Sequence, residues 1–367
     1  MTKTRIALIY GGKSGEHAIS CVTAGAIMRA MDPQRYEVLP IGITRDGNWV
    51  PGHADLAELS LDRGLPEVPD SAQRIVIPAG DGSQSALLIE GQNVTDLGRI
   101  DVAFPVLHGP FGEDGTVQGL LEMAGIAYVG CGVLASAAGM DKHFMKVILA
   151  DAGLPVSPYV TITAQRWATE PQAVRAQVAN LTFPLYVKPA RAGSSLGISK
   201  ITDIAQLDAA IAQAQEHDPK VLVEEEVRGR EVECAVREGR AGQPPCASEL
   251  GEIIIDSSQK EFYDFEHKYV ATDSLTLTIP AQLEESVSER AREYAVRAFS
   301  VFGCEGLTRV DFFITPDGDP IINEINTMPG FTPFSMYPAL WEAAGMSYSD
   351  LVDELIALAQ ERPRGLR

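Results

Sequence analysis

Two runs rich in apolar and β-branched residues flank residues 316–319, which read Pro-Asp-Gly-Asp. Glycine tolerates positive φ, and aspartate side chains bond back to their own backbone, so this tetrapeptide predicts a tight turn. Residues 306–326 are therefore predicted to form a β-hairpin. Regular pairing across the turn predicts three opposed pairs, namely Thr315 with Pro320, Asp311 with Glu324, and Arg309 with Asn326.

The predicted hairpin has two unlike faces, because side chains two residues apart on a strand share a face. The apolar face carries Val310, Phe312, Ile314, Ile321 and Ile325, with Asn323 as the exception. The polar face carries Arg309, Asp311, Glu324 and Asn326. Two carboxylates opposed across a ladder lie roughly 5 Å apart at Cβ, and like charges at that separation destabilise the pair.

The opposed carboxylates of Asp311 and Glu324 need a positive charge between them. Arg309 can supply part of it, but a hard divalent cation bound by carboxylate and amide oxygens offsets the repulsion better. Mg²⁺ held in this way usually completes its coordination shell with water and substrate phosphates, which points to a nucleotide. The hairpin by itself fits equally well with a solvated face that carries one salt bridge.

Composition limits the classes of partner. The 367 residues suggest two or three domains, and 45% hydrophobic with 22% charged residues is typical of a globular protein. The formal net charge of −20 argues against nucleic acid and against anionic membrane surfaces as partners. An anionic substrate would therefore need a local basic pocket.

The cysteines and the apolar runs bear on location. Five cysteines are scattered without a Cys-x-x-Cys pair, which indicates reduced thiols and neither a disulfide framework nor a zinc site. We find no signal peptide and no run of about 20 apolar residues, so we expect no membrane insertion and a cytoplasmic protein.

The first half of the chain predicts a parallel sheet. A buried strand at 5–10, a helix ending near residue 30 and a strand at 36–44 form a βαβ unit. A further strand at 100–108 leads into a glycine-rich turn and a helix at 116–124, with Thr116 as its N-cap. Residues 50–98 are rich in Pro, Gly, Asp and Ser, and we interpret them as an elaboration of this domain with two short strands.

The second half alternates strands and helices beyond a boundary near residues 132–139. A helix at 140–152 carries Lys142 and Lys146, and a strand at 184–189 carries Lys188. Residues 257–274 form a long polar and aromatic stretch, which inside a compact protein is usually functional or mobile.

Several groups suited to phosphate chemistry recur along the chain. Lys188 is followed by the glycine-rich stretch 193–197, whose backbone N–H groups could cradle a phosphate, although such stretches also occur as linkers. With Lys142 and the acidic hairpin they supply the parts that phosphoryl transfer needs, which are cations on phosphate and a bridging metal ion. Glu16, just after a strand end, could hold a substrate ammonium or simply favour the helix dipole. His108 alone is better explained as a bonded strand-end histidine.

Five motifs together resemble the D-alanine–D-alanine ligases of the ATP-grasp superfamily, and the match runs in order from about Ile6 to Leu355 outside 50–98. The motifs are Gly11-Gly-Lys-Ser-Gly-Glu-His17, His108-Gly-Pro-Phe-Gly-Glu-Asp-Gly-Thr-Val-Gln-Gly119, Met140-Asp-Lys142, Val187-Lys-Pro-Ala-Arg-Ala-Gly-Ser-Ser-Leu-Gly197 and Asn323-Glu-Ile-Asn-Thr-Met-Pro-Gly330. The resemblance implies an α/β fold of three domains. These are a parallel-sheet substrate domain at 1–136, a central ATP-grasp domain at 137–225, and a C-terminal ATP-grasp domain at 226–367.

The resemblance also implies a nucleotide and metal site. Lys142 and Lys188 would contact the phosphates of ATP, Glu224, Glu226 and Val227 would line the adenine pocket, and Glu231 would hold the ribose. Ser195, Phe313 and Asn323 would complete the nucleotide site. Asp311, Glu324 and Asn326 would bind two Mg²⁺ ions, with Mn²⁺ as an alternative metal.

For the substrates, the resemblance implies that Glu16 takes the ammonium of the first D-alanine, with His108 nearby. Arg309 and the backbone N–H of Gly330 would form an oxyanion hole. Ser335, Met336 and Lys268 would receive the second D-alanine. Hydrogen bonds among Glu16, Ser194 and Tyr269 would close residues 257–274 over the site as a lid.

The implied reaction forms an acyl phosphate from the first D-alanine and ATP, and the amine of the second D-alanine then attacks it. The product, D-alanyl–D-alanine, serves peptidoglycan synthesis, and relatives of this kind are usually homodimers. The pair Lys268-Tyr269 resembles the peptide-forming ligases rather than the depsipeptide-forming enzymes that use D-lactate. Two alternatives remain, namely such a depsipeptide or other ATP-grasp ligase, and a nucleotide-binding regulatory protein without turnover.

Overall fold

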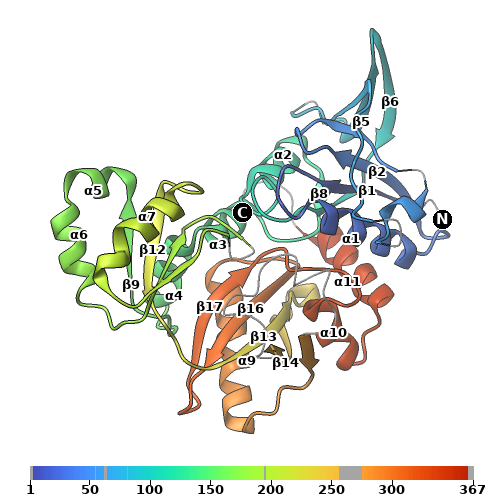
Figure 1. Ribbon diagram of the computed structural model, residues 1–367. Coiled ribbons are helices and arrows are strands. Elements are labelled where there is room, and N and C mark those ends of the chain that lie inside the picture. Colours follow the sequence, from blue (N-terminus) through green and yellow to red (C-terminus); the bar gives the residue numbers. More distant parts are fainter. Residues whose placement is uncertain are drawn as a thin grey trace.

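The computed structural model describes residues 3–53, 55–61, 64–80, 82–193, 196–255 and 275–362. Their helices and strands build a mixed α/β fold, as the sequence predicts, and form four β-sheets. Figure 1 shows the N-terminal sheet in blue, the central sheet in green, and the C-terminal sheet in yellow to orange, each in its own region. The fourth sheet projects from the N-terminal region, where β5 and β6 are labelled.

The N-terminal sheet has the strand order β3-β2-β1-β7-β8 and is parallel except for β3. Its strands are β1 (Thr4–Gly11), β2 (Tyr36–Ile43), β3 (Trp49–Pro51), β7 (Val102–Val106) and β8 (Ala127–Tyr128). Helix α1 (His17–Ala30) connects β1 to β2, which confirms the predicted βαβ unit. Because β1 and β7 are parallel neighbours, the loops that follow them meet at one edge of the sheet.

The predicted N-cap of the next helix is wrong by one residue. Helix α2 (Thr116–Ala124) begins at Thr116, and its N-cap is Gly115 with a φ of 89°. The carboxylate of Asp114 accepts a hydrogen bond from the Thr116 N–H at 3.0 Å, so Asp114 satisfies the first of the free amides at this helix end. Helix α3 (Val133–Met140) then covers most of the range in which we expected a domain boundary.

Residues 50–98 contain more structure than the two strands predicted for them. They form the 3₁₀ turn η1 (Leu56–Leu59) and an antiparallel sheet of β4 (Gln73–Val76), β5 (Ser85–Glu90) and β6 (Asn93–Arg99). The sequence predicts β4 and β5 but misses β6, because most residues of β6 are polar and exposed and show no alternation.

The central sheet is antiparallel with the strand order β11-β10-β12-β9. Its strands are β9 (Tyr159–Thr163), β10 (Leu185–Pro189), β11 (Ser199–Ile201) and β12 (Lys220–Glu225). Its helical segments are α5 (Ala164–Thr169), α6 (Pro171–Val178), η2 (Ile204–Gln206) and α7 (Leu207–Gln215), and side chains of α6 and α7 share one buried cluster with the sheet. Helix α4 (Lys142–Asp151) precedes the sheet, and its N-cap Asp141 accepts the N–H groups of His143 and Phe144.

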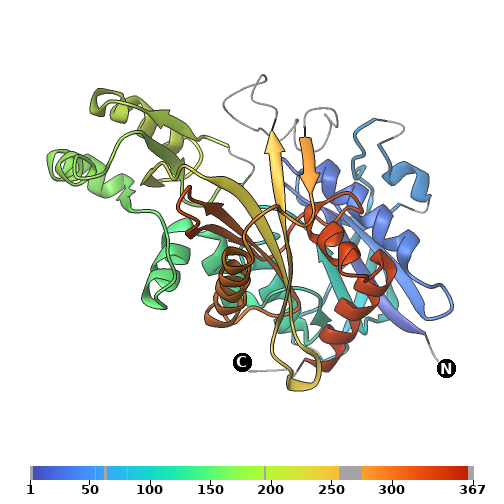
Figure 2. The same cartoon turned by 90° about the horizontal axis from the view of Figure 1, so that it is seen from below.

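The C-terminal sheet has the order β15-β14-β13-β16-β17 and is antiparallel. Its strands are β13 (Arg230–Arg237), β14 (Cys246–Ile255), β15 (Leu275–Thr278), β16 (Leu307–Ile314) and β17 (Pro320–Asn326), with the short η3 (Arg240–Gly242) after β13. Helix α9 (Glu285–Val301) packs with Val232 and Cys234 on one face, whereas α10 (Met336–Ala343) packs with Ala235 on the other. The last helix, α11 (Tyr348–Glu361), contacts α1 and β8, and Figure 2 shows α10 and α11 in red between the C-terminal and N-terminal sheets.

The hairpin exists, but its predicted register holds only at one end. Arg309 pairs with Asn326 and Asp311 pairs with Glu324, as predicted. Beyond Asp311 the register shifts, so Pro320 lies opposite Ile314 and not opposite Thr315.

The cause of the shift is an extra residue in β17, which forms a β-bulge between the Asp311 and Phe312 pairs. The bulge corrects the predicted apolar face as well: Ile322 is fully buried in the core, whereas Ile321 is only partly buried. Asn323 was the exception in the predicted pattern, and it lies at the bulge.

Candidate active site

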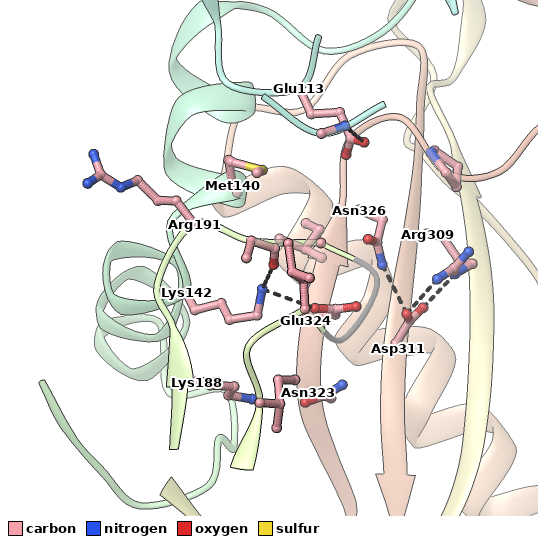
Figure 3. Close-up of a pocket in the computed structure, with 18 of the residues that line it drawn as sticks. Glu113, Met140, Lys142, Lys188, Arg191, Arg309, Asp311, Asn323, Glu324 and Asn326 are labelled. Carbon is pink, nitrogen blue, oxygen red and sulfur yellow. Dashed lines mark hydrogen bonds and ion pairs between the residues drawn. The ribbon is translucent and has the colours of Figure 1, made fainter. Parts of the chain in front are cut away.

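A cavity of about 1210 Å³ lies among the three large sheets. It is lined by the loops after β1 and β7, by the start of α4, by β10, β12 and β13, and by the polar face of the hairpin (Figure 3). The predicted site residues that line it are Glu16, His108, Lys142, Lys188, Glu224, Glu226, Val227, Glu231, Arg309, Asp311, Phe313, Asn323, Glu324, Asn326 and Gly330. Residues from all three predicted domains therefore meet at one cavity.

Some predicted residues do not line this cavity. Ser335 is the N-cap residue of α10, and its hydroxyl lies 2.8 Å from the hydroxyl of Thr332. Met336 is buried, and its side chain fills the space that a Cβ on Gly251 would need. Ser194, Ser195, Lys268, Tyr269 and the predicted lid 257–274 lie outside the described residues.

One wall of the cavity is a cluster of buried ammonium groups around a single carboxylate. Glu224 on β12 forms ion pairs with Lys188 on β10 and with Lys146 on α4, the latter at 3.1 Å. Lys146 is fully buried and also donates to Ser157 at 3.0 Å. Burial raises the pKa of Glu224, but the two ammonium groups outweigh it and bring the pKa to about 2.

Lys142 connects this wall to the hairpin. Its ammonium donates to the carbonyl of Ala192 at 2.8 Å and lies 3.8 Å from a carboxylate oxygen of Glu324 (Figure 3). Burial lowers the pKa of Lys142 and Lys146, because desolvation disfavours their charged forms. At Glu224, two ammonium groups face a single carboxylate, so one positive charge is not balanced. A polyanionic ligand would supply the negative charge that balances it.

The polar face of the hairpin holds a second cluster. Arg309 donates from Nε and from a terminal nitrogen to the two carboxylate oxygens of Asp311, both at 2.7 Å. Nε of Arg309 also lies 2.9 Å from Glu233 on β13, and Asn326 donates to Asp311 at 2.9 Å. Burial alone would lower the pKa of Arg309, but Asp311 and Glu233 raise it well above its usual value. Figure 3 shows Asp311 between Asn326 and Arg309.

The donor atoms of this cluster fit a hard divalent cation. Asp311 and Glu324 supply carboxylate oxygens from directly opposed positions, and Asn326 adds an amide oxygen two residues from Glu324. Mg²⁺ is usually bound in proteins by one or two carboxylates together with water and phosphate oxygens. The same three side chains could also accept Mn²⁺, which prefers carboxylate and carbonyl ligands.

The opposite wall of the cavity carries two carboxylates beside a histidine. Ligand atoms of Glu16, His108 and Glu113 all lie within 4.8 Å of one another. Glu113 accepts the N–H of Gly109 at 2.8 Å, and Nδ1 of His108 lies 3.2 Å from the carbonyl of Met328. Burial, followed by the nearby charge of Glu16, raises the pKa of Glu113 to about 8.

The environment of Glu113 favours a positive charge in this part of the cavity, since a cation would relieve the repulsion between the two carboxylates. Nε2 of His108 is buried and has no hydrogen-bond partner within the part of the chain that the structure describes. A ligand with an ammonium group and further polar atoms would satisfy these groups.

Three residues of the site were not predicted from the sequence, namely Lys146, Glu233 and Glu113. Lys146 lies on the predicted helix at 140–152, but the sequence alone assigns it no role. Glu113 belongs to one of the quoted motifs, but a glutamate in a glycine-rich turn gives no separate indication of function. Glu233 reaches the site through strand pairing with Asp311, which the local sequence does not reveal.

Comparisons with known proteins agree with this geometry. Residues 5–131 match a family described as "D-ala D-ala ligase N-terminus", and residues 148–357 match "D-ala D-ala ligase C-terminus". A D-alanine–D-alanine ligase from Arthrobacter sp. (strain FB24) is 53% identical over 100% of this chain and 96% of the relative. One from Paenarthrobacter aurescens (strain TC1) is 52% identical over 100% of this chain and 97% of the relative.

Two solved structures share the fold. The VanG D-Ala:D-Ser ligase from Enterococcus faecalis has a TM-score of 0.83 and 36% identity, covering 98% of this chain and 100% of its own. The D-alanine–D-alanine ligase from Coxiella burnetii has a TM-score of 0.79 and 34% identity, covering 99% of this chain and 95% of its own. Among the described residues, the helices are too short or too polar to cross a membrane.

Proposed function

Because this chain belongs to the D-alanine–D-alanine ligase family and is an ATP-dependent ligase, we propose that its central cavity joins two D-alanine molecules for peptidoglycan synthesis. The observation that carries the proposal is the division of one cavity into two unlike walls. One wall has excess ammonium groups around Glu224, and the other has the paired carboxylates of Glu16 and Glu113. Such a cavity can hold a polyanion beside a small ammonium compound.

The ammonium-rich wall is the proposed site of ATP. Lys142 and Lys188 bind its phosphates, while β12, β13 and the hairpin hold its base and ribose. The residues proposed for base, ribose and loop contacts are Glu224, Glu226, Val227, Glu231, Phe313, Asn323 and Ser195. Asp311, Glu324 and Asn326 would hold two Mg²⁺ ions, or Mn²⁺ in their place. When bound, these ions would neutralise charge on the phosphate oxygens.

The first half-reaction follows from the placement of the two walls. The ammonium of the first D-alanine binds between Glu16 and Glu113, with His108 beside it, so its carboxylate is directed to the phosphate end of the cavity. A carboxylate oxygen attacks the γ-phosphorus of ATP, the bond to the β,γ-bridging oxygen breaks, and D-alanyl phosphate and ADP result. Holding both reactants in one cavity supplies the proximity that this displacement needs.

In the second half-reaction, the free amine of the second D-alanine attacks the acyl carbon and phosphate leaves. Negative charge develops on the acyl oxygen, where Arg309 and the N–H of Gly330 stabilise it. Losing one such donor typically raises a barrier by about 3 kcal/mol. Ser335 and Met336, which do not line the cavity themselves, are proposed to receive the second D-alanine together with Lys268. Ser194 and Tyr269 are proposed to help residues 257–274 exclude water.

We also propose the domain limits and the setting of the reaction. Residues 1–136 form the substrate domain, and residues 137–225 and 226–367 the two ATP-grasp domains, with the metal-binding hairpin at 306–327. The active form is proposed to be a homodimer in the cytoplasm.

The test is phosphate release from ATP in the presence of Mg²⁺ and D-alanine, with the product identified by its mass. Release that requires D-alanine and yields the dipeptide supports the proposal. D-lactate or D-serine supplied as the second substrate would give products of different mass, and a preference for either would replace the dipeptide assignment. ATP binding without phosphate release under any amino acid would instead indicate a regulatory nucleotide-binding protein.

A further inference from the structure

His17, the first residue of α1, is fully buried and bonded through both ring nitrogens. Nε2 accepts a hydrogen bond from the backbone N–H of Val68 at 3.0 Å. Because Nε2 accepts, Nδ1 carries the proton of the neutral ring and donates to the carbonyl of Gly12, which lies 2.7 Å away. One imidazole therefore joins two backbone segments that lie far apart in the sequence.

The segment held by Val68 belongs to residues 50–98, for which the sequence offers no role. Val68 is buried and packs onto the ends of β1 and β2. A Cβ on Gly42 would lie 2.6 Å from the Val68 side chain, and one on Gly11 would lie 2.8 Å from it. Two glycines thus leave the space that Val68 fills, and the ion pair of Arg45 with Glu67 at 2.8 Å adds an exposed contact beside it.

The segment held by Gly12 is the loop that ends at Glu16. This loop starts from Gly11 and Gly12, both at a φ of 93°, and a Cβ on Gly15 would meet no atom within 4 Å. Within it, the N–H of Glu16 lies 3.2 Å from the Ser14 hydroxyl, and the N–H of His17 lies 3.3 Å from the Ser14 carbonyl. Lys13 and Gly15 are exposed, so hydrogen bonds at the two ends of the loop contribute to its position.

We propose that His17 is a positioning residue for the first D-alanine: by joining Gly12 to Val68 it fixes the loop that presents Glu16 to the substrate ammonium. Residues 64–70 thereby become a supporting part of the substrate site. The inference rests on the proposed function, in which Glu16 binds that ammonium. His17 does not itself line the cavity, so its effect is exerted through the loop.

Three substitutions of His17 distinguish the contributions of its two hydrogen bonds. His17→Asn places an amide N–H near the position of Nδ1 and retains the donor to Gly12. His17→Gln reaches the position of Nε2 and retains an acceptor for Val68. His17→Phe keeps a ring and loses both bonds, which leaves two buried backbone groups without their partner.

The measurements are the KM for the first D-alanine, the KM for ATP, and hydrogen exchange of the Val68 amide. We expect His17→Phe to raise the KM for the first D-alanine by about tenfold or more while the KM for ATP changes by less than about twofold. His17→Asn and His17→Gln should give smaller increases. Exchange at Val68 should accelerate in His17→Phe and His17→Asn but not in His17→Gln.

Tyr128→Phe is the control for the variants that lose a single bond, because it removes the hydrogen bond to Glu122 at 2.8 Å within the N-terminal region. It should leave the KM for D-alanine unchanged. If His17→Phe does not fold, the KM for the first D-alanine in His17→Asn and His17→Gln, each compared with the wild type, still decides the question. An unchanged KM for the first D-alanine in the folded His17 variants, or an equal rise in Tyr128→Phe, overturns the inference. Absence of D-alanine-dependent phosphate release in the wild type would overturn the proposed function instead.

Discussion

Asp311 and Glu324 are direct partners in the β16–β17 ladder, and regular pairing ends immediately beside them at a bulge. Each carboxylate has its own cation in this structure, since Arg309 bonds Asp311 and the ammonium of Lys142 lies 3.8 Å from Glu324. Because of the bulge, Ile322 and the two carboxylates lie on opposite faces of the hairpin. One face therefore packs in the core, and the other lines the cavity. The predictions below follow from these charge pairs.

Glu324→Gln should nearly abolish turnover while leaving the fold intact. The substitution removes one of two opposed carboxylates, which weakens metal binding and also relieves their repulsion. We expect D-alanine-dependent phosphate release to fall by about a thousandfold, with a melting temperature close to that of the wild type, because the lost ion pair with Lys142 offsets the relieved repulsion. Asp319→Asn, at the exposed tip of the same hairpin, makes the same charge change and should keep its activity. Normal turnover in Glu324→Gln would remove this residue from the metal site.

Arg309→Lys should lower kcat much more than it changes the KM for ATP. Lysine keeps the charge but cannot reproduce the forked bonds from Arg309 to Asp311 and to Glu233. A displaced donor stabilises the developing oxyanion poorly, so we expect kcat to fall by about a hundredfold.

Steady-state kinetics at saturating ATP measure this effect, and Arg292→Lys on α9 is a surface control that should behave as the wild type. Retention of the wild-type kcat by Arg309→Lys would show that the guanidinium holds the two carboxylates without contributing to the oxyanion hole.

How far the hairpin could be predicted depends on which end is considered. Alternation places Asp311 and Glu324 on one polar face, but the register derived from the turn is wrong by one residue beside the turn. The pair Asp311–Glu324 is nevertheless correct, because the bulge restores the predicted register at that point. The prediction fails between the turn and Phe312, since alternation cannot distinguish a bulge from a polar residue on an apolar face. Asn323 was that polar residue, and it marked the bulge.

The cavity could be predicted only in part, for a similar reason. Lys146 follows Lys142 by one helical turn, so the sequence already places both ammonium groups on one face of α4. Glu233 enters the site because β13 pairs with β16, and Glu113 because its loop lies beside the loop of Glu16. These contacts are long-range, and local periodicity carries no information about them.

Glu224→Gln should destabilise the nucleotide-free protein more than Lys146→Met does. The glutamine variant leaves the ammonium groups of Lys146 and Lys188 buried without their carboxylate, whereas the methionine variant leaves Glu224 paired with Lys188. Loss of one partner from a buried ion pair typically costs about 3–5 kcal/mol, so we expect a loss of that order for Glu224→Gln and a smaller one for Lys146→Met.

The free energy of unfolding in urea, without nucleotide, measures both variants. Asp208→Asn is the control, because it breaks an exposed pair with Arg175 and should cost less than about 1 kcal/mol. A larger loss in Lys146→Met than in Glu224→Gln would contradict this account of the charge balance.

Glu113→Gln should remove a pH dependence of stability from the ligand-free protein. In the folded state the pKa of Glu113 is raised to about 8, whereas an unfolded glutamate has a pKa of about 4.3. Between these values the folded state keeps a proton that the unfolded state has lost, so stability falls as pH rises through this window. Glutamine stays neutral and can still accept a hydrogen bond from the Gly109 N–H. The variant should therefore match the wild type at pH 4 and melt at a higher temperature than the wild type at pH 8.5.

Melting curves across this range test the prediction, with the exposed Glu90→Gln as the charge-matched control. Parallel curves for Glu113→Gln and the wild type would mean that Glu113 is ionised in the empty cavity, and that the first D-alanine meets two charged carboxylates rather than displacing a proton from one of them.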